Sequence, residues 1–174
     1  NEINDKYGQS PQELEANEEF VSALLNATPV AIKTHQKEKV RALKNALINI
    51  GNPDDEDFEM SQQFIRYIDE LSVMHLKVLA GLEKHAGQID RKEKMEQVYS
   101  DLVKRAGLKI ERLPFRSIIE DLKTRFLILT GDIDEYPEFA TKSETLVTDQ
   151  SGIRPLTVTK LGRTFLNFIG EFEP

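Results

Sequence analysis

Six basic side chains in the last third of the chain have the chemistry of nucleic-acid contacts. Three fall on a helix expected over 114–125 and three lie in or shortly after an expected strand: Arg116, Lys123 and Arg125, then Arg154, Lys160 and Arg163. Lysine and arginine bind phosphate, and an arginine near the N-terminal end of a helix can reach a guanine edge. Glu120 and Asp121 share the solvated surface of that helix and would repel phosphates. The pattern therefore predicts either a DNA-reading helix or a solvated, protein-facing one.

A second group of basic residues lies near the N-terminus. Lys33, Lys37, Arg41 and Lys44 recur every three to four residues and would line one helix face. Such a face binds a polyanion or an anionic membrane surface. The alternative is a solvated face opposite an inward apolar stripe, which is the usual role of charges on a helix.

No pattern in the chain indicates catalysis or metal binding. The three histidines, His35, His75 and His85, fall on different expected helices and lack metal-ligand spacing. There is no cysteine, and the acidic run over 54–57 lacks the alternating ligands and central glycine of a calcium loop. We therefore expect a protein that is not an enzyme, with no catalytic residue, metal or cofactor.

Composition limits the possible partners. The chain has 174 residues, of which 39% are hydrophobic and 30% charged, as in a globular protein. Its net charge of −7 repels nucleic acid as a whole, so DNA binding is possible but disfavoured. No apolar run approaches the roughly 18 residues of a membrane span, and the absence of cysteine fits a cytoplasmic protein.

The elements that would position these side chains are mainly helices. Ser10, Pro11 and Glu13 predict a capped helix start, with the helix reaching about residue 27. Thr28-Pro29 predicts either a second helix start or a kink, and two consecutive helices are the favoured interpretation. Gly51 and Gly107 are expected helix stops. Further helices are expected over 58–71, 73–84, about 90–106 and 114–125, then strands over 127–129 and 154–158 around a long loop, and a closing helix.

Several of these segments resemble winged-helix regulators of the MarR type. The segments are Asp69–Leu79, Asp121–Ile128 and the C-terminal stretch that contains Thr159 and Gly162. With the run Lys37–Asn49, the chain also resembles an uncharacterised bacterial family with a long N-terminal helix, distantly like abortive-infection proteins of phage defence. Two features depart from the MarR pattern. Phe126 stands where glycine is usual, and the expected wing loop is acidic at Asp132, Asp134, Glu135 and Glu138.

The resemblance implies a mainly α fold. We expect a disordered tail over 1–9, a helical N-terminal lobe over 10–56 and a winged-helix-like domain over 57–174 with a small two-stranded β wing. A winged helix either reads DNA or docks protein. Because the charge pattern disfavours DNA, we expect a non-catalytic interaction or regulatory module, with a winged-helix DNA-binding regulator as the alternative.

The N-terminal lobe carries an apolar stripe that needs a partner surface. Its residues are Phe20, Leu24, Val40 and Leu47. In the regulators that the chain resembles, an N-terminal helix pairs with its two-fold mate, which implies a homodimer here. The alternative is packing within the chain, across the back of the C-terminal domain.

Overall fold

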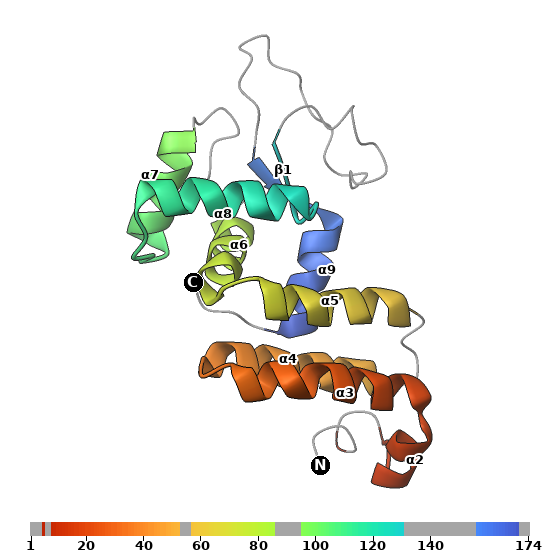
Figure 1. Cartoon of the computed structure of the whole chain (residues 1–174). Helices are drawn as coiled ribbons and strands as arrows, with labels where there is room; N and C mark the ends of the chain where they lie inside the picture. The colour runs from red at the N-terminus through yellow and green to blue at the C-terminus, as the bar shows by residue number, and fades with distance from the viewer. Residues whose placement is uncertain (1–4, 6–7, 53–56, 86–94, 131–155, 171–174) are drawn as a thin grey trace. The chain divides into compact units, whose positions relative to one another are not determined.

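The computed structural model describes residues 5, 8–52, 57–85, 95–130 and 156–170. The protein is mainly helical, with a two-stranded antiparallel sheet, as the sequence predicts (Figure 1). The chain divides into two compact units, one covering 1–73 with the end of the last helix from Asn167, the other covering 74–166. The division falls after Val73, whereas the sequence suggested a boundary after residue 56. The expected disordered tail lies outside the described residues, except for residues 5, 8 and 9.

The first unit contains three helices that lie side by side, with a shorter one before them (Figure 1). The elements are α2 (Pro11–Ala16), α3 (Glu18–Lys33), α4 (Lys37–Ile50) and α5 (Phe58–Glu70). Small side chains let α3 and α4 approach closely, because Ala23, Ala27, Ala42 and Ala46 are all at most 2% exposed. Larger side chains of α5, including Phe64 and Ile68, complete the core of this unit.

Local capping explains where the first helices begin. The predicted capping box is confirmed, since the Ser10 amide donates to Glu13 Oε2 at 2.7 Å and the Glu13 amide donates to Ser10 Oγ. Hydrogen bonds from the Ser10 amide and the Ser10 hydroxyl to the Glu13 carboxylate lower the pKa of that carboxyl. The expected continuous helix to residue 27 is wrong, because Asn17 ends α2 and starts α3 by accepting a hydrogen bond from the Phe20 amide at 3.0 Å.

The predicted helix start at Thr28-Pro29 is also wrong. Pro29 lies inside α3, and the break falls instead after Lys33, at residues 34–36. Proline removes the hydrogen bond that would reach the Leu25 carbonyl. Leu25 and Pro29 are both exposed, so water can bond that carbonyl in place of the missing amide.

Helix α4 supplies hydrogen-bond donors to the C-terminal ends of two other helices. Lys39 Nζ donates to the Asp69 carbonyl in the last turn of α5 at 2.8 Å. Asn45 and Asn49 donate to the Ile169 and Phe168 carbonyls at the end of the last helix, at 2.8 and 2.7 Å. These carbonyls have no partner within their own helices, so α4 satisfies them. Burial lowers the pKa of the Lys39 amine, although the nearby Asp69 opposes the shift.

The second unit contains the remaining helices and the sheet. Its elements are most of α6 (Val73–His85), α7 (Met95–Arg105), α8 (Arg112–Thr124), β1 (Ile128–Thr130), β2 (Leu156–Val158) and most of α9 (Lys160–Ile169). The strands pair antiparallel, with Ile128 opposite Val158. Gly107 has φ 63°, so the predicted left-handed helix stop is confirmed. The expected loop between the strands lies outside the described residues.

A compact corner joins α8, β1 and α9. Phe126 is 42% exposed and has φ 55°, the left-handed conformation that glycine prefers. Thr159 Oγ1 donates to the Phe126 carbonyl at 2.7 Å and accepts from the Gly162 amide at 2.9 Å. A Cβ atom on Gly162 would collide with the Leu127 carbonyl oxygen. Backbone packing in this unit therefore requires the pair of Thr159 and Gly162 at the start of α9.

Candidate interaction surface

The strongest candidate site is the side of α3 that faces away from its core. Leu25, Thr28, Pro29 and Ile32 follow one another at helical spacing and are all exposed; we call them the α3 outer face. Leu25 is 67% exposed and Ile32 is 74% exposed. The inward side of the same helix is formed by Ala23, Ala27 and Val30, which are buried. Folding of the first unit therefore leaves an apolar side of α3 uncovered.

The α3 outer face carries no charge. From Phe20 to Ile32 no residue is charged, although charged residues make up 30% of the chain. The Thr28 hydroxyl donates to the Leu24 carbonyl at 2.6 Å, so it is already satisfied within the helix. Charges appear only at the two ends of α3, with Glu18 and Glu19 in the first turn and Lys33 in the last. An exposed apolar patch with a charged rim is typical of a protein-docking surface.

The apolar stripe that the sequence singled out is only partly exposed. Leu24 and Val40 are each 42% exposed, whereas Phe20 and Leu47 are half-buried. The most exposed apolar residue of α3, Ile32, was not among them. The uncharged run between Glu19 and Lys33 is the sequence signal that would have indicated it.

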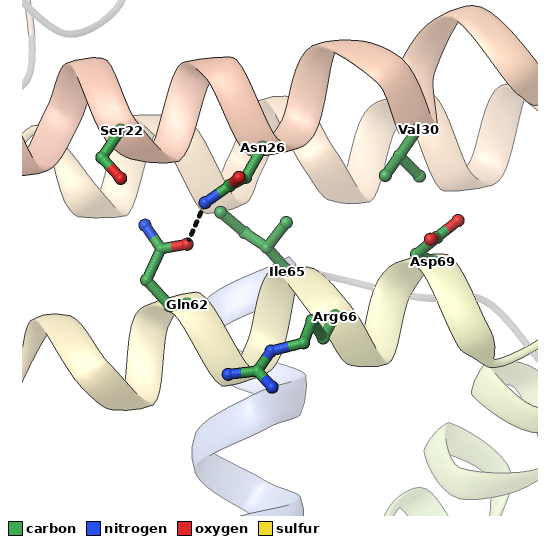
Figure 2. Close-up of a pocket in the computed structure, with 7 residues that line it drawn as sticks. All are labelled: Ser22, Asn26, Val30, Gln62, Ile65, Arg66 and Asp69. Carbon is green, nitrogen blue, oxygen red and sulfur yellow. Dashed lines mark hydrogen bonds between the residues drawn. The ribbon is translucent and has the colours of Figure 1, made fainter.

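A groove of about 490 Å³ lies between α3 and α5 (Figure 2). Asn26 Nδ2 donates to Gln62 Oε1 across it at 2.7 Å. Figure 2 shows Ser22 and Asp69 at opposite ends of the groove, so the Ser22 hydroxyl and the Asp69 carboxylate are not paired with each other. Gln62 Nε2 is buried without a hydrogen-bond partner. The groove lining thus lacks a nucleophile placed beside a base, which acyl-transfer chemistry requires.

The expected basic helix face is divided between two helices. Lys33 ends α3, whereas Lys37, Arg41 and Lys44 lie on α4, because the chain breaks at residues 34–36. All four side chains are exposed. The break means that Lys33 does not continue the face formed by the other three.

Several cations proposed for nucleic-acid contact are engaged within the second unit. Lys123 Nζ donates to Glu120 Oε2 at 2.9 Å, and Arg163 Nε donates to Glu83 Oε1 at 3.1 Å. Arg125 donates to the Asp121 carbonyl at 3.1 Å. A phosphate would have to compete with these partners.

Two of the other three candidates lie on helices of the same unit. Arg116 and Lys160 are exposed on α8 and α9. Arg154 lies outside the described residues.

The structure places His75 and His85 on one helix, α6, and His35 in the break between α3 and α4, so the prediction of three different helices is wrong. His75 Nε2 lies 3.1 Å from Asp121 Oδ2 in the second unit, which ties α6 to α8. Within the described part of the chain, no three His, Asp or Glu side chains are grouped so that they could hold a metal ion. None of the helices described there has both the length and the apolar character needed to cross a bilayer.

Comparison with known proteins adds no relative, because no family model, curated protein or solved structure matches the chain. The resemblance to MarR-type regulators therefore stays a prediction from the residues quoted for it.

Proposed function

We propose that this chain is a non-catalytic interaction or regulatory module of the bacterial cytoplasm, and that it binds protein through the α3 outer face. The observation that carries the proposal is the exposure of Leu25 and Ile32 within an uncharged stretch of helix. Covering such a leucine or isoleucine contributes about 1–2 kcal/mol to binding. Neither side chain contributes to the inward core of its unit, so folding does not account for them.

The winged-helix-like part of the proposal rests on the order of elements in the second unit. Helix α8 is followed by the paired strands β1 and β2 and then by α9. This order agrees with what the MarR resemblance implies. Lys123 and Arg163 already have carboxylate partners, which favours protein docking over DNA reading for this module.

Site-specific photo-crosslinking tests the docking role. A benzoylphenylalanine replaces Leu25 in one variant and Leu113 in a matched control, since Leu113 is 79% exposed on α8. We expect discrete protein adducts from position 25, lost when Ile32→Glu is added, and none from position 113. Equal adducts at both positions, or none at position 25, would remove the α3 outer face as a docking surface.

Fluorescence anisotropy on duplex DNA at low salt tests the alternative. We expect no saturable binding, because two of the cations are held by carboxylates and the net charge is −7. Binding that weakens steeply with salt and is reduced by Lys160→Glu would favour a DNA-binding regulator instead.

A further inference from the structure

We infer that the groove between α3 and α5 binds a short zwitterionic peptide of about three residues, with the peptide carboxylate near Gln62 and Arg66 and its ammonium group near Asp69. The site is separate from the α3 outer face, because α3 lines the groove with Ser22, Asn26 and Val30 instead. The inference follows from the polar groups at the two ends of the groove and from the distance between them.

One end of the groove carries hydrogen-bond donors. Gln62 Oε1 accepts from Asn26, whereas Gln62 Nε2 is buried without a hydrogen-bond partner in the part of the chain that the structure describes. Figure 2 shows this nitrogen directed toward Ser22, and the Arg66 side chain running along α5 toward the same end. Gln62 is half-buried and lines the groove, so a small rotation of its amide would present the nitrogen to a bound oxygen. A carboxylate accepts hydrogen bonds from an amide, a hydroxyl and a guanidinium group alike.

The opposite end carries an acceptor. Asp69 is exposed there, in the last turn of α5 (Figure 2). Lys39 donates to the backbone carbonyl of Asp69 at 2.8 Å, so that hydrogen bond does not use the carboxylate oxygens. The C-terminal end of a helix also attracts cations through its dipole. An ammonium group of a ligand therefore fits this end of the groove.

The distance between the two ends sets the length of the ligand. Gln62 and Asp69 are seven residues apart on α5, which corresponds to about 10 Å along the helix. An extended tripeptide spans about 10 Å, whereas a dipeptide spans about 7 Å. Between the ends, the buried Val30 and Ile65 line the groove and suit an apolar side chain in the middle of the peptide. The volume of about 490 Å³ is ordinary for a small-ligand site.

Titration of the isotope-labelled chain with alanyl-leucyl-alanine, followed by NMR, tests the site. We expect a dissociation constant of about 0.1 mM, which is ordinary for a ligand of about twenty non-hydrogen atoms. The side-chain amide resonances of Gln62, identified by their loss in Gln62→Met, should shift on binding. Gln62→Met should also weaken binding about tenfold, because it removes a donor to a charged group. Unshifted Gln62 resonances at about 5 mM peptide would overturn the site.

Peptide length gives a second readout. Alanyl-leucine should bind about threefold more weakly than the tripeptide, because it cannot reach both ends of the groove at once. Equal affinities would show that the two ends are not recognised together and would overturn the inference.

Matched changes in the peptide and in the chain test the direction of binding. Acetylation of the peptide amine and Asp69→Asn each remove one partner of the same ion pair, so each should weaken binding about threefold, and both together no more than either alone. The same relation should hold between amidation of the peptide carboxylate and Arg66→Gln. Glu70→Gln and Lys37→Gln are the controls, because they remove charges from positions outside the groove lining. Effects that multiply within a pair, or controls that weaken binding equally, would contradict the assigned direction.

Ile32→Glu separates failure of this site from failure of the docking role. It alters the α3 outer face and leaves the groove lining intact, so the affinity for alanyl-leucyl-alanine should stay unchanged while the photo-crosslinked adducts are lost. Loss of peptide binding in this variant would place the peptide on the α3 outer face and overturn the groove as its site.

Discussion

The close approach of α9 to Leu127, directly before β1, gives the sharpest prediction about the fold, through Gly162→Ala. A Cβ at this position would overlap the Leu127 carbonyl oxygen and would lie 2.8 Å from Val158 Cγ1. Val158 can change rotamer, but the Leu127 carbonyl, directly before β1, cannot move away without disturbing the strand. The added methyl group therefore has to displace the start of α9.

Displacing α9 also breaks hydrogen bonds at the same oxygen. The Thr159 amide donates to the Leu127 carbonyl at 3.1 Å, and Thr159 Oγ1 lies 3.3 Å from it. Overpacking costs about 1–3 kcal/mol, and each lost hydrogen bond costs about 1 kcal/mol. Alanine returns about 1 kcal/mol through its higher helix propensity. We expect a net loss of about 3 kcal/mol in the free energy of unfolding.

Urea unfolding followed by circular dichroism measures this loss. Gly107→Ala is the matched control, because Gly107 has φ 63° but no atom within 4 Å of a Cβ built there. The control should lose about 1 kcal/mol from backbone strain alone. A Gly162→Ala protein as stable as the original would refute the close approach, because the gain in helix propensity would then be unopposed.

Three further predictions concern single side chains. Thr159→Val should destabilise the chain by about 1–3 kcal/mol in urea unfolding, because it leaves the Phe126 carbonyl and the Gly162 amide without their partner; an unchanged midpoint would contradict this. Phe126→Gly should be about 1 kcal/mol more stable than Phe126→Ala, because both remove the ring and only glycine relaxes at φ 55°; equal stabilities would show that the left-handed conformation is not kept. Burial lowers the pKa of Lys39 below its ordinary value of 10.5, so the folded state releases this proton at lower pH than the unfolded state. The protein with Lys39 should therefore gain stability relative to the Lys39→Met variant as the pH rises from the folded pKa of Lys39 toward 10.5. A stability difference between the two proteins that stays constant across this pH range in thermal unfolding would disprove the burial effect.

The sequence predicts local structure well where one short segment determines it. Ser10 and Glu13 form their capping box, and Gly107 ends its helix, because each depends on residues within one turn. The break at Asn17 was missed although its signals are local. Asn17 followed by Glu18 and Glu19 is a good N-cap with an acidic first turn, but apolar residues on both sides suggested one continuous helix.

Long-range contacts determine the features that the sequence did not reveal. Lys39 sits in a run of charges, yet it is 8% exposed because the end of α5 offers it a carbonyl thirty residues away. Arg163 looks free in the sequence, but Glu83, eighty residues earlier, forms an ion pair with it. Charge alone therefore overestimates how many cations remain for a ligand.

Apolar periodicity identifies the side of a helix that folding covers. It therefore does not indicate the apolar residues that remain exposed for a partner. Ala23, Ala27 and Val30 follow that periodicity on α3 and are buried. Leu25 and Ile32 interrupt it, and they are the residues left exposed. Exposed apolar side chains increase the risk of aggregation, whereas a docked partner would cover them. This reasoning favours a binding role for the α3 outer face, and it makes the interruptions of an apolar pattern more informative about function than the pattern itself.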